Sequence, residues 1–386
     1  MDLVVLADLH IDVRGSRFDE TERVNAWIAE EVKRRAPAAV LVAGDVFHRA
    51  STPGDRLYAA GFLSRLAKVC PVIGIAGNHD VEGDLALFPK LSTDHGVSFY
   101  ERPDIHLLAT GDAAVACVPW RREAPDPALL ALPPAERKAA ERAAIRAMLS
   151  GLADDMDRCD PATRIAIVHA MLEEADVKIG QPDKRGSEFL LSLDDLALLR
   201  ADVIAIGHVH AGQSWTIGPA PVFYPGSTIR RSFGEREEKQ IAVLHCDGPE
   251  VRVESVKTPA RPMLFVEARW ADQGTGSYGF ALDEDALLAE ASGADVRIRY
   301  DVEPAHREAA REAASALAHS LASAGGIVGK PEERLAATSA ARAPEIATVA
   351  SMRDKLAVTL TVKGCGPEAP QRERVLALFD RVCGSS

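Results

Sequence analysis

Five short, continuous apolar runs constrain the fold of this chain more than any other feature of its sequence. Each run is four or five residues long and lacks the apolar–polar alternation of a half-exposed strand. Each therefore predicts a strand that is buried on both faces, which is typical of an α/β fold. In such folds, ligands gather outside the carboxyl ends of the strands. The runs are Val4–Ala7, Val40–Ala43, Val72–Ala76, Ile165–Val168 and Val203–Ile206.

Residues of metal-binding types follow each of these runs. A glycine stands directly before Asp45, before Asn78 and before His208. Oxygen and nitrogen donors without thiolates suit Mn²⁺, Fe or Zn²⁺ better than Ca²⁺. We expect the set to hold two divalent metals that share the Asp45 carboxylate, an arrangement that recurs in phosphatases and nucleases. The seven expected ligands are Asp8, His10, Asp45, Asn78, His169, His208 and His210.

Each motif taken alone is weak evidence for a metal site. Asp-x-His and Gly-Asp occur by chance in many chains, and a single histidine after an apolar run is more often a hydrogen-bonded core residue. The His-x-His pair of His208 and His210 is by itself as compatible with a structural role as with metal binding. The order of all five motifs, each at the same place relative to a strand, favours the metal site.

Length, charge and cysteine content indicate the size of the protein and the environment in which such a site would work. A chain of 386 residues is long enough for one large domain and a smaller one. The net charge of −12 is unusual for a free-standing nucleic-acid binder, so any polyanion must be held by a local basic patch, metals or a partner. The six cysteines form no C-x-x-C pair. The N-terminus has no positively charged segment, and Asp8 interrupts its apolar run too early for a signal peptide. No stretch is apolar for long enough to predict a membrane span. We expect a reduced, cytoplasmic protein.

Predicted strands and helices alternate as far as about residue 256. Helical spacing covers Phe18–Arg35, and residues 133–152 form an amphipathic helical pattern. Another helix is expected to begin at Pro53, with Thr52 as its cap and Asp55 completing a capping box. Residues 222–224 and 241–244 predict additional strands.

A composition shift at residues 259–262 predicts a domain junction, with domains at 1–258 and 262–386. The second domain is expected to be a small α+β unit. Its predicted strands are 264–268, 296–300 and 355–362, and its predicted helices are 306–324 and 371–382.

The five motifs together resemble those of the calcineurin-like metallophosphoesterases, over about residues 1–257. That resemblance implies two mixed β-sheets packed together and flanked by helices. Three further segments resemble the SbcD family, the nuclease subunit of the SbcC–SbcD complex that repairs DNA double-strand breaks. These are Gly44–His48, Val118–Arg121 and Tyr224–Ile229. The second domain matches the capping domain of that family in the order of its elements.

The resemblance also implies roles for single residues. One metal would be held by Asp8, His10, Asp45 and His210, and the other by Asp45, Asn78, His169 and His208. His79 resembles the catalytic histidine that acts on the phosphate, with Asp80 orienting its ring, and His48 resembles an accessory histidine near the scissile phosphate. One departure is Ile11-Asp12 after His10, where the family often has a short apolar residue and glycine.

The implied activity is Mn²⁺-dependent DNA cleavage by in-line attack of a metal-activated water. It comprises 3′→5′ exonuclease action and endonuclease action on single strands or hairpins, by a homodimer working with an SbcC-type ATPase. Candidate DNA contacts are Arg121, Arg122, Arg230 and Arg231, and the run Glu235–Lys239 predicts a solvated turn. Two alternatives remain: a phosphodiesterase of a small nucleotide or lipid-linked substrate, and a non-catalytic scaffold.

Overall fold

The computed structural model describes residues 1–121, 131–177, 189–274, 277–335, 351–363, 365–366 and 369–383. These residues form two compact units, each described by itself. The first unit comprises residues 1–266, 284–297 and 319–330, and the second comprises 267–283, 298–318 and the described residues from 331 onward. The domain boundaries at residues 258 and 262 stay a prediction. Among the described residues, no helix is long and apolar enough to cross a membrane.

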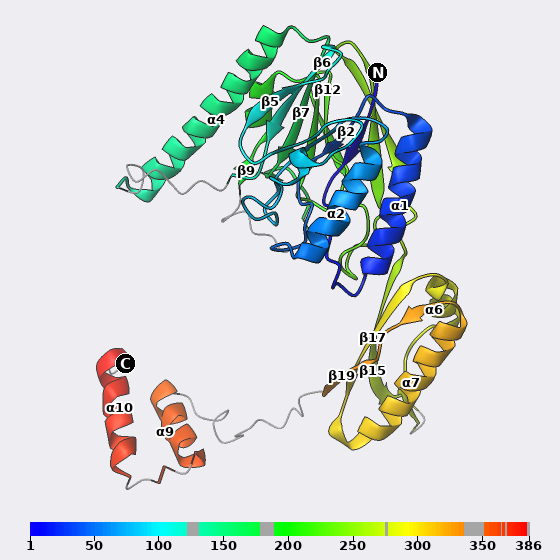
Figure 1. Ribbon diagram of the computed structural model, residues 1–386. Coiled ribbons are helices and arrows are strands. Elements are labelled where there is room, and N and C mark those ends of the chain that lie inside the picture. The colour runs from blue at the N-terminus through cyan, green and yellow to red at the C-terminus, as the bar shows by residue number, and fades with distance from the viewer. Residues whose placement is uncertain are drawn as a thin grey trace. The chain divides into compact units, whose positions relative to one another are not determined.

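Two six-stranded mixed sheets form the centre of the first unit (Figure 1). In the first sheet, three parallel pairings join four strands, and two antiparallel strands extend the sheet at one edge. Its strands are, in spatial order, β14 (Glu250–Lys257), β13 (Gln240–Asp247), β1 (Asp2–Leu6), β2 (Ala39–Val42), β3 (Val72–Ile75) and β4 (Val97–Tyr100).

The second sheet has a parallel centre and an antiparallel strand at each edge. Its strands are, in spatial order, β11 (Gln213–Ile217), β12 (Ala220–Tyr224), β10 (Val203–Gly207), β7 (Thr163–His169), β6 (Ala113–Val118) and β5 (Asp104–Leu107). Within each sheet the parallel strands bring their carboxyl ends to the same edge. All five predicted strands are confirmed, and the expected strands at 222–224 and 241–244 lie within β12 and β13.

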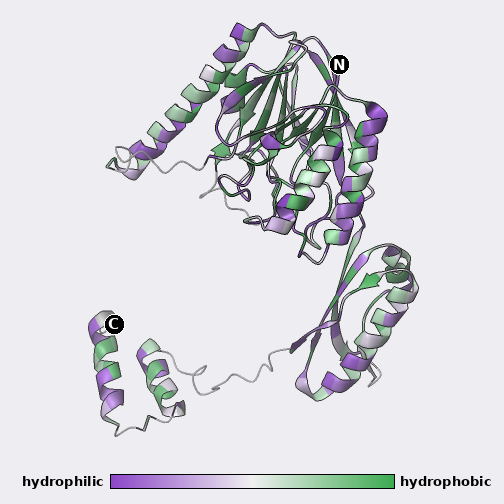
Figure 2. Ribbon diagram, viewed as in Figure 1, coloured by the Kyte–Doolittle hydropathy of each residue, from purple (hydrophilic) through white to green (hydrophobic). Residues whose placement is uncertain are grey.

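Both faces of the central strands are buried, which explains their continuous apolar runs (Figure 2). Successive side chains of a strand point to opposite faces. Leu3 and Val5 of β1 therefore lie in the core between the two sheets, together with Ile165 of β7. Val4 and Leu6 belong instead to the core beneath the helices. The first unit is thus a two-sheet sandwich flanked by helices, the fold class that the sequence predicts.

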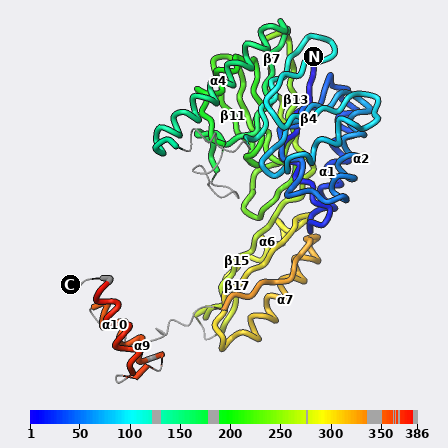
Figure 3. The backbone as a smooth tube through the Cα atoms, turned by 60° about the vertical axis from the view of Figure 1, so that its left-hand side comes forward, coloured from blue at the N-terminus to red at the C-terminus, as the bar shows by residue number. Residues whose placement is uncertain are grey.

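Helices cover the outer faces of both sheets, as Figure 3 shows from a second direction. The helices α1 (Phe18–Arg35) and α2 (Pro53–Leu66) pack on the first sheet, and α4 (Pro134–Cys159) packs on the second. The predicted capping box is present, because Thr52 Oγ1 accepts from the Asp55 amide at 3.3 Å and the Thr52 amide donates to Asp55 at 2.7 Å. Helix α4 extends seven residues beyond the predicted end at residue 152.

Several short elements complete the two layers. The strands β8 and β9 pair with each other in parallel. These elements are β8 (Met171–Leu172), β9 (Leu190–Leu191), α5 (Leu193–Leu196), η1 (Phe88–Lys90) and η2 (Ala197–Leu199).

A third sheet follows the predicted junction. Its core in the second unit includes Tyr300 and Val302, which pack with Ala310 and Ala314. Its strands are β16 (Tyr278–Phe280), β15 (Met263–Asp272), β17 (Asp295–Val302) and β18 (Ile327–Val328), with β19 (Glu332–Leu335) pairing with β17. The helical elements of this region are α6 (Glu284–Ala291), η3 (Pro304–His306) and α7 (Arg307–Ser323).

One element at the end of the described chain differs from its prediction. Residues 355–362, predicted as a strand, belong to the helix α9 (Met352–Val362), which contacts α10 (Pro370–Cys383). Ser351 caps α9, since its side chain accepts a hydrogen bond from the Asp354 amide at 3.1 Å. The β-branched residues suggested a strand, but the cap and the packing against a second helix favour the helix.

Candidate metal centre

A first group of ligand-type side chains joins two distant parts of the chain. Asp8 and His10 follow β1, and His210 follows β10. Ligand atoms of these three residues lie within 4.8 Å of one another. The Nε2 atoms of His10 and His210 are 2.9 Å apart. Asp8 and His10 are buried, so the three side chains converge where water has little access.

A second group lies at the ends of four strands, one of which is again β10. Ligand atoms of Asp45, His169 and His208 lie within 4.8 Å of one another. The side-chain oxygen of Asn78 is 3.1 Å from Nε2 of His169 and 2.9 Å from Nδ1 of His208. These residues belong to the ends of β2, β3, β7 and β10, in agreement with the expected convergence.

Asp45 lies between the two groups. Its Oδ2 atom is 3.6 Å from Nε2 of His10 and 3.5 Å from Nε2 of His169. Its Oδ1 atom accepts a hydrogen bond from the backbone amide of His79 at 2.9 Å. The structure therefore brings all seven expected ligands together, with Asp45 placed as a shared ligand requires. That they bind metals stays a prediction.

The backbone at these strand ends is strained. A positive φ is uncommon for a residue with a Cβ atom and costs on the order of 1–3 kcal/mol. Such residues persist only where the surrounding structure holds them, and they cluster at functional sites. Four of the seven ligand-type residues have a positive φ: Asp8 (52°), His10 (45°), Asp45 (52°) and His208 (108°).

Glycines before the ligand-type residues are required by close packing. A Cβ atom on Gly77 would lie 2.1 Å from Oδ1 of Asp45. One on Gly207 would lie 1.9 Å from the carbonyl oxygen of Ala43. The loops that follow β2, β3 and β10 are therefore packed too tightly for any side chain at these positions, which explains the repeated glycine in the sequence motifs.

Burial and mutual attraction shift the protonation of the site. Burial by itself would raise the pKa of Asp45, but the imidazoles of His169 and His10 hold it well below its ordinary value. Burial would likewise lower the pKa of His169, but the carboxylates of Asp45 and Asp8 raise it to about 9. Burial raises the pKa of Asp8 despite the neighbouring imidazoles. Burial lowers the pKa of His10 well below its ordinary value, so the raised pKa is that of His169 and not of every imidazole in the site.

The donor set fits a pair of divalent cations. Buried oxygen and nitrogen acceptors this close together repel one another unless a cation lies between them. Nδ1 of His10 is buried and has no hydrogen-bond partner among the described residues. The polar contact of this ring with His210 is made by Nε2. One metal would be held by Asp8, His10, Asp45 and His210, and the other by Asp45, Asn78, His169 and His208.

His79 and His48 lie on the solvent side of the first group. Ligand atoms of His10, His48 and His79 lie within 4.8 Å of one another. His48 is exposed and His79 is half-buried, whereas His10 is buried. The ring of His79 stacks on that of His48 at a centroid distance of 5.8 Å, and its Nδ1 atom donates to the His48 carbonyl oxygen at 2.5 Å.

Asp80 has a different role from the one expected. It is fully buried and accepts backbone hydrogen bonds from Gly77 at 2.8 Å, from Phe47 at 2.8 Å and from Val46 at 3.3 Å. Three amides from two loops converge on this carboxylate, so it joins the loops after β2 and β3. Among the described residues, no hydrogen bond joins Asp80 to the ring of His79, whose Nδ1 atom donates to the carbonyl of His48.

Arg230 is also placed differently from its expected role as a DNA contact. Its buried guanidinium donates to the backbone carbonyls of Glu235 at 3.2 Å, Glu237 at 2.7 Å and Arg261 at 3.0 Å. Because its donors point at the backbone, Arg230 stabilises the loop between β12 and β13. This geometry does not support DNA binding by Arg230.

The other arginine candidates have different surroundings. Arg231 is half-buried, and its guanidinium donates to the carbonyl of Leu9 next to the first group. Arg121 is half-buried and lines a cavity. Arg122 lies outside the described residues. DNA binding by Arg121, Arg122 and Arg231 stays a prediction.

The predicted solvated turn at Glu235–Lys239 is partly wrong. Glu235 is 1% exposed and Lys239 is 2% exposed. They form an ion pair of 2.6 Å, and Glu235 also lies 3.3 Å from Nδ1 of His210. A run of charged residues predicts exposure, and only the fold places two of them inside. Glu235 and Lys239 are thus site residues that sequence reasoning missed.

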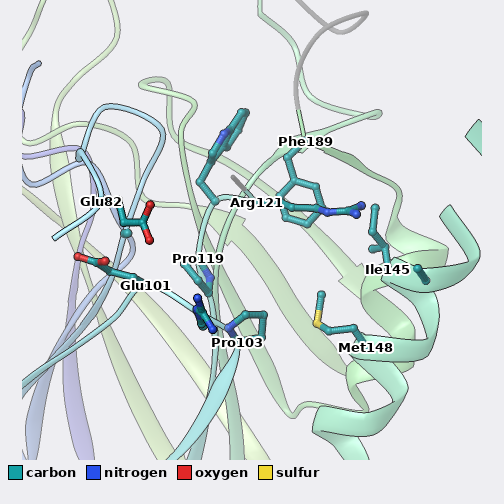
Figure 4. Close-up of a pocket in the computed structure, with 12 residues that line it drawn as sticks. Glu82, Glu101, Pro103, Pro119, Arg121, Ile145, Met148 and Phe189 are labelled. Carbon is teal, nitrogen blue, oxygen red and sulfur yellow. The ribbon is translucent and has the colours of Figure 1, made fainter. Parts of the chain in front are cut away.

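A cavity of about 680 Å³ adjoins the second group (Figure 4). Trp120 lines it and packs on the ring of His208 at a centroid distance of 5.1 Å. Figure 4 shows Glu82 and Glu101 on one side of the cavity and Ile145 and Met148 of α4 on the other. A mixed apolar and charged lining of this size is typical of a small-ligand site.

Comparisons with known proteins agree with this geometry. Residues 1–130 match the calcineurin-like phosphoesterase family. The chain is 26% identical over 286 residues to the DNA double-strand break repair protein Mre11 of Aeropyrum pernix, covering 70% of this chain and 64% of that protein. It is 24% identical over 237 residues to the protein of the same description from Methanosarcina mazei, covering 60% and 33%. The matches therefore span less than two thirds of either relative.

Similar solved structures include TT1561 of Thermus thermophilus, at 13% identity and a TM-score of 0.38, covering 66% of this chain and 99% of that one. GAP50 of Plasmodium is 12% identical with a TM-score of 0.42, covering 67% and 85%. Residues 1–130 are thus similar to the calcineurin-like phosphoesterase family, and the two-sheet fold of the first unit agrees with that similarity.

Proposed function

We propose that the chain is the metal-dependent nuclease subunit of a DNA-break repair complex of the Mre11 and SbcD kind. The observation that carries the proposal is the pair of ligand groups joined by Asp45, with His79 on their solvent side. This arrangement defines the side from which a substrate binds, because a phosphodiester can approach the metals from the side of His79.

The chemistry follows from the positions of these side chains. When bound, two divalent metals supply an activated water and neutralise charge on the phosphoryl oxygens. Nδ1 of His79 donates to the carbonyl of His48, so Nε2 is the atom left to contact substrate. In its protonated form, His79 donates from Nε2 to the leaving oxygen, and Asp45 holds the His79 backbone beside the metals.

Similarity supports DNA as the substrate. Both relatives named above are described as DNA double-strand break repair proteins. By this similarity we propose 3′→5′ exonuclease and single-strand or hairpin endonuclease activity, a homodimer, and an SbcC-type ATPase as partner. Mn²⁺ is the proposed metal, because the donors are oxygen and nitrogen atoms without thiolate. The net charge of −12 makes binding depend on the metals and nearby arginines.

Cleavage assays with purified protein and Mn²⁺ test the proposal. Duplex, hairpin and single-stranded DNA are compared with bis(p-nitrophenyl) phosphate, with and without the ATPase partner. We expect cleavage of DNA and of the small diester, and loss of both in Asp45→Ala. His79→Ala is expected to lower kcat by about 10²–10⁴-fold while leaving Mn²⁺ binding intact. Unchanged activity in either variant would show that the site is assigned wrongly.

A second function is favoured by the cavity beside His208. Its volume of about 680 Å³ and its contact with Trp120 suit a small nucleotide diester. The same assays separate the two functions. Cleavage of small diesters without any DNA cleavage, even with the ATPase partner present, would replace the nuclease by a small-molecule phosphodiesterase.

A further inference from the structure

The ring of His210 is held on the side away from the metal ligands. Its Nε2 atom faces His10 at 2.9 Å, and its Nδ1 atom lies 3.3 Å from Oε1 of Glu235. A carboxylate can only accept in this contact, so Nδ1 carries the proton. The lone pair of Nε2 then points toward the first ligand group, which is the tautomer that a metal ligand needs.

Glu235 is in turn fixed by its own partners. Its Oε2 atom is 2.6 Å from Nζ of Lys239 and accepts from the Arg231 amide at 3.1 Å. A carboxylate that is 1% exposed is costly unless it is paired and hydrogen-bonded, and here both oxygens have partners. Lys239 also donates to the backbone carbonyl of His210 at 2.9 Å. One ion pair therefore holds both the ring and the backbone of His210.

The loop after β12 completes this support. Gly226 has a φ of 80°, and a Cβ atom there would lie 2.6 Å from the carbonyl oxygen of His210. The amide of Ser227 donates to that same carbonyl at 3.1 Å. The backbone of His210 is thus packed against a glycine and bonded from two sides, so its position does not depend on the ring contact alone.

We propose that Glu235 is a positioning residue of the metal centre, which keeps His210 in the tautomer and orientation for metal binding, while Lys239 holds Glu235 in place. The inference rests on the proposed metal-dependent function and adds the residue that retains one of its two metals. That metal is the one assigned to Asp8, His10, Asp45 and His210. Loss of such a supporting carboxylate typically weakens metal affinity by 10–100-fold.

Titration of metal-free protein with Mn²⁺ tests the proposal without any activity assay. The electron paramagnetic resonance signal of free Mn²⁺ reports the number and affinity of the bound ions. In Glu235→Gln we expect one of two sites to weaken by about 10–100-fold and the other to keep its affinity. Glu238→Gln is the matched control, because Glu238 lies on the same loop but is exposed and pairs with Lys257. It should bind both ions as wild type does.

A second variant separates positioning from folding. Glu235→Gln leaves the buried Lys239 ammonium group with Glu237, at 2.5 Å, as its remaining carboxylate, so the variant also lowers the thermal unfolding temperature. The double variant Glu235→Gln/Lys239→Met removes both charges. We expect it to recover part of the unfolding temperature while one Mn²⁺ site stays weak. Recovery of full Mn²⁺ affinity would overturn the proposal, because Glu235 would then be only a counter-ion to Lys239.

The remaining outcomes are equally decisive. If Glu235→Gln binds two Mn²⁺ ions with wild-type affinity, the positioning role is wrong although the metal centre stands. If wild-type protein binds no Mn²⁺, the metal centre fails and the proposal fails with it. If wild type binds two ions but cleaves no DNA, the nuclease function fails while the role of Glu235 is still judged by the titration.

Discussion

Glu235 and Lys239 belong to a run of five charged residues, yet the fold buries both of them. Burial by itself would raise the pKa of Glu235, but the hydrogen bond with His210 and the charge of Lys239 lower it to about 2. The charged form of Glu235 is therefore favoured by folding. At the scale of single residues, the chemistry of a side chain depends on which groups the tertiary structure places against it.

The lowered pKa predicts how stability depends on pH. The contribution of Glu235 is fully present above its unfolded pKa near 4.5 and is lost as pH falls toward the folded value of about 2. Its upper size is about 3 kcal/mol, at 1.36 kcal/mol for each pKa unit. Urea unfolding of metal-free protein at pH 6 and pH 3.5 measures it. We expect Glu235→Gln to lose less stability over this interval than wild type, and equal losses would contradict the prediction.

At the scale of secondary-structure elements, the loops that follow the strands position the site. The parallel strands β1, β2 and β3 stop at one edge, and the loops beyond them contain the strained residues and the tightly packed glycines. Helix α2 begins shortly after the loop that follows β2, and its capping box is hydrogen-bonded to the loop that follows β1. Asp55 closes the capping box with Thr52 and also accepts from the Val13 amide at 2.7 Å.

This double contact makes the start of α2 a testable support of the site. Thr52→Ala removes the side-chain acceptor for the Asp55 amide and should cost about 1 kcal/mol of unfolding free energy. Ser64→Ala, within the same helix but away from its cap, should change stability by less than about 0.5 kcal/mol. Denaturant unfolding compares the two variants. A Thr52→Ala variant as stable as Ser64→Ala would mean that the cap contributes nothing measurable.

At the scale of the whole molecule, the candidate metal centre joins residues that lie 200 positions apart in the sequence. Asp8 and His10 follow β1 of the first sheet, and His208 and His210 follow β10 of the second. The amide of His208 donates to the Asp8 carboxylate at 3.0 Å. Metals that bind both groups would therefore hold the two sheets together at their common edge.

Bound metal should consequently stabilise the folded protein. At a concentration 100 times its dissociation constant, a ligand that binds only the folded state adds about 2.7 kcal/mol per site. We expect Mn²⁺ to raise the thermal unfolding temperature and a chelator to reverse the effect. Asp45→Asn, which weakens the shared ligand, should respond much less. A wild-type protein whose unfolding temperature ignores Mn²⁺ would argue against the centre.

Much of this architecture can be predicted from local sequence. Strands that are buried on both faces must be continuously apolar, so the apolar runs around Val4 and Val40 can be predicted as strands from the sequence. The helix at Phe18–Arg35 follows from its spacing, and the start of α2 from its capping residues. The helix α9 was mispredicted as a strand, because residues 355–362 are rich in β-branched types and their contact with α10 is not a local property.

The sequence by itself determined the strands, the ligand types at their ends and the glycines before them, because these depend on neighbours along the chain. Tertiary structure alone decided which ligand-type residues lie in the same group. It also decided that Asp80 binds the backbone of two loops and not the ring of His79, and that Arg230 and Glu235 are buried. The physical reason is distance along the chain. The proposed role of Glu235 depends on its contacts with His210 and Lys239. Only folding brings the loop after β12 against the end of β10.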